Sequence, residues 1–217
     1  MGREILRSRR GLLGAGALFL GGAALLGGGL AASRGSTADV PAGEAGGEWQ
    51  TGPSLAVARS EVAAATANGV VYVLGGLAAD GATLGVVEAL EPGAVEWAMR
   101  RPLPEPRDHL AAVELGGDLW VVGGSPGWFN QQTSTTLWRY DARQDTWEHR
   151  APMPLGRAAH ASAVIDGVLY VVGGIGPDPQ KLLAYDPIAD LWTERAPLPR
   201  PREHLAAAAV DGQLFVI

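Results

Sequence analysis

The feature that most constrains the fold is an internal repeat in the larger, C-terminal part of the chain. Four Trp residues are spaced 48, 50 and 45 positions apart, an Arg follows each after ten positions, and a Gly pair follows the first three after 26 positions. A period of this length indicates one small unit that stacks on copies of itself. The repeated residues are Trp49, Trp97, Trp147 and Trp192; Arg59, Arg107, Arg157 and Arg202; and Gly75-Gly76, Gly123-Gly124 and Gly173-Gly174.

Each copy predicts four short strands. Small residues follow the Arg, and a two-residue hairpin signal such as Asn68-Gly69 or Asp166-Gly167 separates them from four apolar residues that end at the Gly pair. A strand that is apolar throughout is typically covered on both faces. The third strand ends at Tyr140 or Tyr185 in the second and third copies, and the fourth strand contains the Trp.

A four-stranded sheet that is covered on both faces and recurs every 45–50 residues is a propeller blade. The sequence therefore predicts an all-β fold. The combination of an apolar quartet, a Gly pair, Tyr and Trp resembles the Kelch repeat over residues 49–217. The resemblance implies a Kelch-type β-propeller, with repeats at about 49–96, 97–146, 147–191 and 192–217.

The predicted ring of blades is incomplete. The chain ends at Ile217, inside the second strand of the fourth copy, so it supplies three full four-stranded blades plus half a blade. In Kelch propellers, an N-terminal strand like the one at Trp49 typically completes the last blade. Because six or seven blades need roughly 290–340 residues, we expect this sequence to be the N-terminal part of a longer protein. A half-ring that closes by pairing two chains is the alternative.

The N-terminal segment predicts an export signal. Four Arg residues among the first ten are followed by residues 11–32, which carry no charge and include eight Gly. The pair Arg9-Arg10 resembles a twin-arginine signal of a bacterium or archaeon. An uncleaved membrane anchor is the alternative, because about 20 apolar residues span a bilayer. We expect residues 1–38 to be the signal or anchor, residues 39–48 a linker, and the propeller extracytoplasmic.

The composition excludes several classes of site and partner. The chain has no Cys, which removes disulfides, Cys-ligated zinc, thiol nucleophiles and iron–sulfur clusters. Its formal net charge is −6, with no basic stripe that could neutralise phosphates, so we expect no nucleic-acid partner. Contact with a membrane is expected only through the N-terminal segment, if that segment stays uncleaved.

The candidate ligand-binding residues belong to loops at one end of the predicted blades. Arg supplies forked donors for carboxylates or sugar hydroxyls, and exposed aromatic rings supply stacking surface. The alternative is structural, because a repeated Arg could bond carbonyls of the adjacent blade and the His residues could cap the core, so that no metal site is expected. The candidates are Arg59, Arg107, Arg157 and Arg202, with His109, His160, His204, Trp128 and Phe129.

These residues favour a binding module over an enzyme. The sequence shows no Gly-x-Ser-x-Gly nucleophile elbow and no His–Glu metal motif. We expect an exported propeller that binds a protein, peptide or glycan through the Arg-bearing loops, without a cofactor. The alternative is a carbohydrate-active Kelch enzyme completed by further C-terminal sequence. A sialic acid mutarotase type is the nearer of the two, since galactose oxidase needs a Tyr–Cys cross-link beside copper.

Overall fold

The computed structural model describes residues 4–7, 51–127 and 132–217, which form strands, turns and loops without a helix. Among these residues there is accordingly no helix of the length and apolar character that crossing a membrane requires. The strands form three four-stranded antiparallel sheets and one three-stranded sheet. The all-β prediction, with three full blades and an incomplete fourth, is confirmed.

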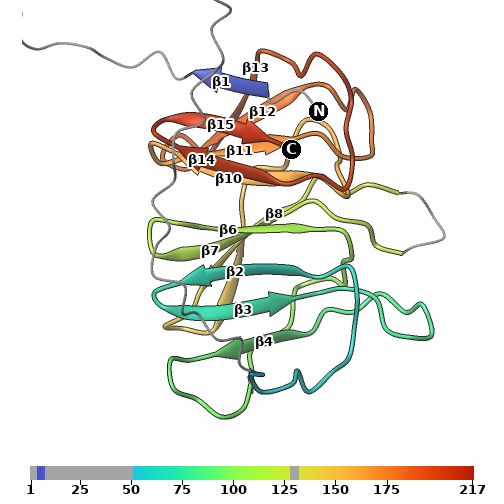
Figure 1. The fold of residues 1–217 in the computed structure, drawn as a ribbon, viewed down its shortest axis with the longest axis vertical. Coiled ribbons are helices and arrows are strands. Elements are labelled where there is room, and N and C mark those ends of the chain that lie inside the picture. The colour runs from blue at the N-terminus through green and yellow to red at the C-terminus, as the bar shows by residue number, and fades with distance from the viewer. Residues whose placement is uncertain (1–3, 8–50, 128–131) are drawn as a thin grey trace, which may run out of the picture. The chain divides into compact units, whose positions relative to one another are not determined.

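Each complete sheet pairs its strands in chain order, so that each sheet is a meander (Figure 1). The fourth sheet has the order β1-β15-β14. Blade 1 comprises β2 (Ala63–Ala67), β3 (Val70–Leu74), β4 (Val87–Leu90) and β5 (Ala98–Met99); blade 2 comprises β6 (Ala111–Leu115), β7 (Asp118–Val122), β8 (Leu137–Asp141) and β9 (Thr146–His149); blade 3 comprises β10 (Ala161–Ile165), β11 (Val168–Val172), β12 (Leu182–Asp186) and β13 (Leu191–Arg195); and the fourth sheet comprises β14 (Ala207–Val210), β15 (Gln213–Val216) and β1 (Glu4–Arg7).

The tight hairpins join the first and second strands of each blade, as predicted. Asn68 and Gly69 have φ values of 51° and 80°, and Asp166 and Gly167 have values of 50° and 75°. Positive φ at both central positions matches the right-handed twist of the paired strands. Turns of neighbouring blades also touch, because the Asn68 side chain donates to the Gly117 carbonyl over 2.6 Å.

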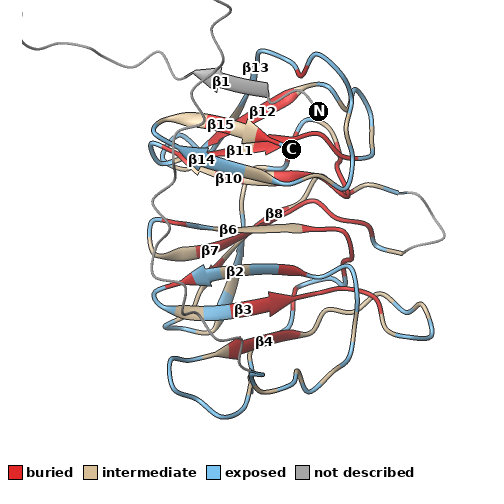
Figure 2. Cartoon of the chain, in the orientation of Figure 1, coloured by how far each residue is buried: buried red, intermediate tan, exposed pale blue. Residues whose placement is uncertain are grey.

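The hydrophobic core lies between successive blades. The first strands β2, β6, β10 and β14 contact one another in that order, and their small residues allow this close approach. Between blades 1 and 2, Leu74 and Tyr72 pack with Val121, Trp138 and Tyr140. Similar apolar clusters fill the spaces between blades 2 and 3 and between blades 3 and 4. Figure 2 shows the resulting buried stretches along β3, β4 and β8, and the exposed β14 of the incomplete blade.

The repeated Trp residues tie each blade to the segment that leads into it. The indole N–H groups of Trp97, Trp147 and Trp192 donate to backbone carbonyls 44, 46 and 41 residues earlier, over 2.9, 3.1 and 2.7 Å. The Trp147 ring also lies 4.7 Å from the Tyr140 ring, and Trp192 lies 5.0 Å from Tyr185. These Trp and Tyr residues therefore hold the outer strand onto the third strand.

The Gly pairs are the points where one blade docks onto the next. The second Gly of each pair donates its N–H to the carbonyl of the next blade's repeated Arg, over 2.8 Å from Gly76 and Gly124 and over 2.7 Å from Gly174. Both residues of each pair have positive φ. A Cβ on Gly123 would lie 2.5 Å from the Arg157 carbonyl oxygen. No side chain fits where two backbones approach this closely.

Most of the predicted signal lies outside the described residues, as do the linker, Arg9, Arg10, Trp49, Trp128 and Phe129. Residues Glu4–Arg7 are described, and they form β1, antiparallel to β15 with Glu4 opposite Val216. In the complete blades this edge of the second strand is occupied by the third strand. The edge of β15 therefore accepts an additional strand, as expected for an unfinished blade.

We predict that Gly123→Ala destabilises the protein far more than Gly167→Ala does. Both glycines have positive φ, 65° and 75°, so both substitutions strain the backbone by about 1–2 kcal/mol. Of these two glycines, Gly123 is the one whose added Cβ would clash with a neighbouring carbonyl, whereas nothing lies within 4 Å of a Cβ on Gly167. Urea unfolding of the full chain should show an additional loss of at least about 2 kcal/mol for Gly123→Ala. Equal losses would contradict the docking role.

Candidate functional site

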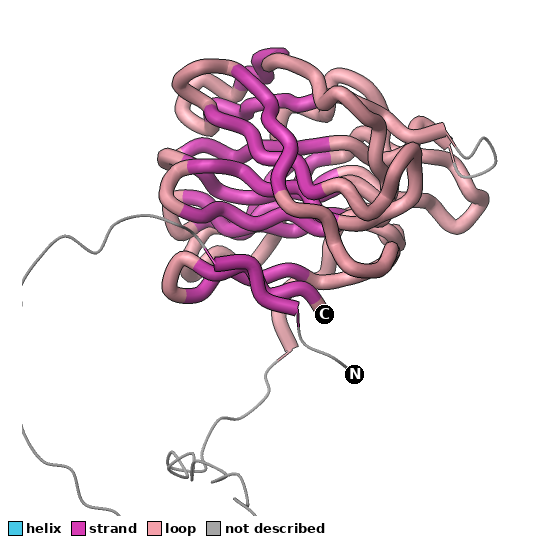
Figure 3. Tube along the Cα trace, turned by 90° about the horizontal axis from the view of Figure 1, so that it is seen from above, coloured by secondary structure: helices cyan, strands magenta, loops and turns pink. Residues whose placement is uncertain are grey.

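The loop face is the end of the blades that carries the connections between blades and the loops between second and third strands. Figure 3 shows these loops extending well beyond the strands, whereas the tight hairpins close the other end. The loops between second and third strands comprise residues 75–86, 123–136 and 173–181, with residues 128–131 undescribed. The sequence predicts such a set of loops at one end of the blades, and the strand order gives this arrangement.

An inner ring of four residues lies where the first strands begin, at the position two residues after each repeated Arg. Its members are Glu61, His109, Ala159 and His204, with φ values of 51°, 52°, 50° and 47°. Each backbone N–H after the first donates to the carbonyl of the preceding member, over 3.1, 2.8 and 2.9 Å. This chain of hydrogen bonds runs from blade to blade and explains why residues other than Gly adopt the left-handed conformation here.

The guanidinium group of Arg59 lies inside blade 1. Its Nε donates to the Gly75 carbonyl over 2.9 Å, its Nη2 donates to the Val73 carbonyl over 3.1 Å, and its Nη1 forms an ion pair with Glu88. Both side chains of this pair are fully buried. Glu88 also accepts the backbone N–H of Ala56 over 2.6 Å. The buried carboxylate thus orders both the Arg and the segment that leads into the blade.

The residue opposite the Arg differs between blades, and the Arg changes its partners accordingly. In blade 2, Trp138 occupies the position of Glu88, and the Arg107 guanidinium lies 5.3 Å from the centre of its ring. Arg107 forms its ion pair with Glu105 of the preceding connection instead. In blade 3, the corresponding residue is Leu183. There the Arg157 guanidinium donates to backbone carbonyls of residues 156, 177 and 178, and burial lowers its pKa.

Arg59, Arg107 and Arg157 are therefore structural residues of their blades. The Arg59 and Arg107 side chains are 0% and 6% exposed and Arg157 is fully buried, so none of the three presents its guanidinium on the surface of the loop face. Their partners belong mainly to their own blade, not to the adjacent blade as the structural alternative expected. Arg202, in the incomplete blade, is half-buried.

We predict that Glu88→Ala destabilises the protein by about 3–5 kcal/mol, because it leaves a buried guanidinium without its counter-charge. Thermal or urea unfolding of the full chain measures the loss. Glu194→Ala is the matched control, since Glu194 pairs with Lys181 over 2.9 Å at an exposed site on blade 3. The control should change the stability little, because exposed pairs contribute little. Similar losses in both variants would contradict the role assigned to the buried pair.

His160 is a buried packing residue and does not belong to the inner ring. It follows Ala159, so its side chain points into the space between blades, with its ring and backbone against the two Gly pairs of blades 2 and 3. Neither ring nitrogen has a hydrogen-bond partner among the described residues. Burial, with a smaller contribution from the positive charge of Arg157, lowers the pKa of His160 to about 3. The imidazole is therefore neutral at pH 7.

We predict that His160 makes the protein less stable in acid. Because the folded-state pKa is lowered from 6.5 to about 3, the unfolded chain binds more protons below pH 6.5, and stability falls as the pH drops through that window. Between pH 7.5 and 5 this residue alone should cost about 2 kcal/mol. Urea unfolding at both pH values should show that His160→Leu removes this loss and His149→Leu does not. An unchanged pH dependence in His160→Leu would contradict the assignment.

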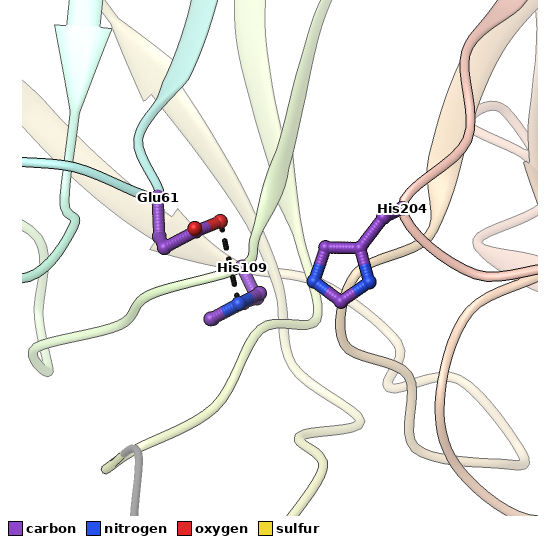
Figure 4. Close-up of side chains that lie close together, drawn as sticks. All are labelled: Glu61, His109 and His204. Atoms are coloured by element: carbon purple, nitrogen blue, oxygen red, sulfur yellow. Dashed lines mark ion pairs between the residues drawn. The ribbon is translucent and has the colours of Figure 1, made fainter.

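Three members of the inner ring bring ionisable side chains together, as Figure 4 shows. Their nearest ligand atoms lie within 4.8 Å of one another. The Nε2 atom of His109 lies 3.3 Å from the Glu61 carboxylate, and the His204 ring centre lies 5.3 Å from that of His109. His109 is buried, whereas Glu61 and His204 are exposed at the loop face. Among the described residues, Glu61, His109 and His204 are the cluster whose donor atoms could together hold a metal ion.

The prediction from sequence named two of these three residues and missed Glu61. The signal was present, because Glu61 follows Arg59 by the same two positions that separate His109 from Arg107 and His204 from Arg202. His160 follows its Arg by three positions, and that single shift moves it from the ring into the core. The spacing from the Arg, more than the residue type, decides which side chain faces the ring.

The fold and the ring together define a class of protein, a β-propeller whose blades dock through Gly pairs and enclose a ring of left-handed residues. Residues 44–217 match the family model described as the KLHDC2/KLHL20/DRC7 Kelch-repeats domain. The chain therefore belongs to the Kelch-repeat family, as the resemblance predicted.

Relatives and a solved structure agree with this assignment. Beta-scruin of Limulus polyphemus is 30% identical over 138 residues, which cover 62% of this chain and 15% of that protein. Kelch-like protein 21 of Homo sapiens is 36% identical over 107 residues, which cover 48% of this chain and 17% of that protein. The structure of YjhT superposes with a TM-score of 0.67 at 20% identity, over 76% of this chain and 58% of that one, and supports the fold.

Proposed function

We propose that this propeller is an interaction module that binds a protein or peptide through its loop face. The observation that carries the proposal is that the repeated residues are structural, whereas the loops that differ between copies are exposed. The repeated Arg, Gly, Tyr and Trp lie inside or between the blades and hold them together. The loops of the loop face differ in sequence from copy to copy and carry exposed residues, which a rigid scaffold can present to a partner.

The loop face of blade 3 presents both an apolar residue and charged residues, which a bound peptide can contact. Ile175 is 40% exposed in the loop between β11 and β12, and the exposed acid Asp178 and half-buried Lys181 follow in the same loop. Arg200 and Glu203 are exposed in the connection from blade 3 to the fourth sheet. An apolar contact surrounded by charges of both signs is typical of protein interfaces.

Export remains a proposal that the N-terminal pattern supports. A basic segment and an uncharged, Gly-rich segment precede the propeller. A twin-arginine route carries proteins that are already folded, which suits a domain without disulfides. The proposed partner is accordingly an extracytoplasmic protein or peptide.

We predict that Ile175→Asp weakens peptide binding and Ile188→Asp does not. The two residues belong to the same blade and are both exposed, but Ile188 lies in the turn between β12 and β13, at the opposite end. Peptides selected from a displayed random library on the immobilised full chain serve as probes. Their affinity should fall at least about tenfold in Ile175→Asp, equivalent to about 1.4 kcal/mol.

Two outcomes would contradict this proposal. Peptides that bind both variants as tightly as the original chain do not use the loop face. A chain that selects no peptide but binds defined oligosaccharides on a glycan array is a carbohydrate-binding propeller instead.

A further inference from the structure

We propose that Glu61, His109 and His204 form a binding site for a divalent transition-metal ion, of which Zn²⁺ fits the donor set best. The site lies on the inner ring, at the loop face, where the first strands of the blades begin (Figure 4). Its ligands are ring residues, and none of them is an outer-loop residue assigned above to peptide binding.

The three side chains reach the site from three different segments whose backbones are held in place. Glu61, His109 and His204 precede β2, β6 and β14, and they share the same left-handed conformation. The ring hydrogen bonds through Ala159 link these segments without any help from the side chains. The site is thus built on a rigid frame before any ion arrives, which lowers the cost of binding.

His109 is oriented as a metal ligand. Its Nδ1 lies 2.6 Å from a carboxylate oxygen of Asp108, which is fully buried. Thr83 donates its hydroxyl to the other oxygen of Asp108 over 2.7 Å. An imidazole that donates one N–H to a carboxylate presents its other nitrogen as a ligand, and this arrangement recurs at zinc sites.

The contact between His109 and Glu61 provides two donor atoms that suit a cation. A neutral imidazole has one N–H, yet both ring nitrogens of His109 face carboxylates, Asp108 at 2.6 Å and Glu61 at 3.3 Å. With the proton directed to Asp108, the lone pair on Nε2 faces the negative oxygen of Glu61, which is repulsive. A metal ion between the two atoms would accept both the Nε2 lone pair and a carboxylate oxygen.

The donor spacing and the third ligand also fit a metal ion. Zinc–ligand bonds of about 2.0–2.1 Å in a tetrahedral site place neighbouring donors about 3.3 Å apart, and the Glu61–His109 distance has this value. His204 offers another imidazole nitrogen within 4.8 Å, and its exposed side chain is free to turn toward the pair. Two imidazoles and one carboxylate suit zinc, whereas magnesium and calcium prefer oxygen ligands alone.

The fourth member of the ring leaves one side of the site open. Ala159 carries only a methyl group and supplies no donor atom. Three protein ligands with an open fourth position are typical of zinc sites that bind water or an external group. The proposed ion would therefore offer a coordination position toward the loop face, which a carboxylate from a partner could occupy.

The test is a titration of the full chain, without an affinity tag and treated with a chelator, with ZnCl₂ in a calorimeter and with CoCl₂ in a spectrophotometer. We expect one equivalent of zinc to bind and cobalt to give the intense visible absorption of a low-coordinate site. Glu61→Gln and His204→Ala should each weaken zinc binding by about 10- to 100-fold or more. His204→Ala is compatible with the fold, because Ala159 holds the same ring position with the same φ.

His149→Ala is the matched control. His149 is an exposed His on β9 of blade 2 and does not belong to the ring, so its removal should leave zinc binding unchanged. Three results would overturn the proposal. The original chain binds zinc no more tightly than about 0.1 mM; or Glu61→Gln and His204→Ala bind zinc as the original chain does; or His149→Ala abolishes binding, which places the ion elsewhere.

Discussion

One backbone hydrogen bond, repeated at each junction, underlies the whole structure. The second Gly of each pair donates to the carbonyl of the next blade's Arg, and the absence of a Cβ lets the two backbones meet. This contact sets the spacing of the blades, so the apolar clusters between them close at the right distance. It also places the start of each blade's first strand beside the start of the preceding blade's first strand. These starts together form the inner ring. The loop face is a consequence of the same contact.

The repeated Arg occupies the same position in each blade, but the residues that its side chain contacts differ. The backbone carbonyls of Arg107, Arg157 and Arg202 accept the docking hydrogen bond, whereas the side chain of the repeated Arg adapts to its own blade. Glu88 gives an ion pair, Trp138 a cation–π contact, and Leu183 leaves the backbone carbonyls as acceptors. Because these Arg side chains are buried within their blades, the ionisable groups that the loop face exposes are others, among them Glu61 and His204 of the ring.

The fold could be predicted from sequence because the repeat fixes strand order, turn positions and burial at once. The hairpins at Asn68-Gly69 and Asp166-Gly167 and the apolar second strands were found where expected. The site could be predicted only in part. The direction of an Arg side chain depends on which residue lies opposite it in the third strand, and the period carries no information on that partner.

By itself, the sequence determined the architecture, since hydrophobic period, glycine position and turn residues act locally and recur in every copy. It also named His109 and His204, together with His160, as residues that closely follow the repeated Arg. Only the tertiary structure decided that Glu61 joins them and that His160 does not. Residues from blades far apart in the chain become neighbours only when the blades dock, and a shift of one residue turns a side chain from the ring into the core.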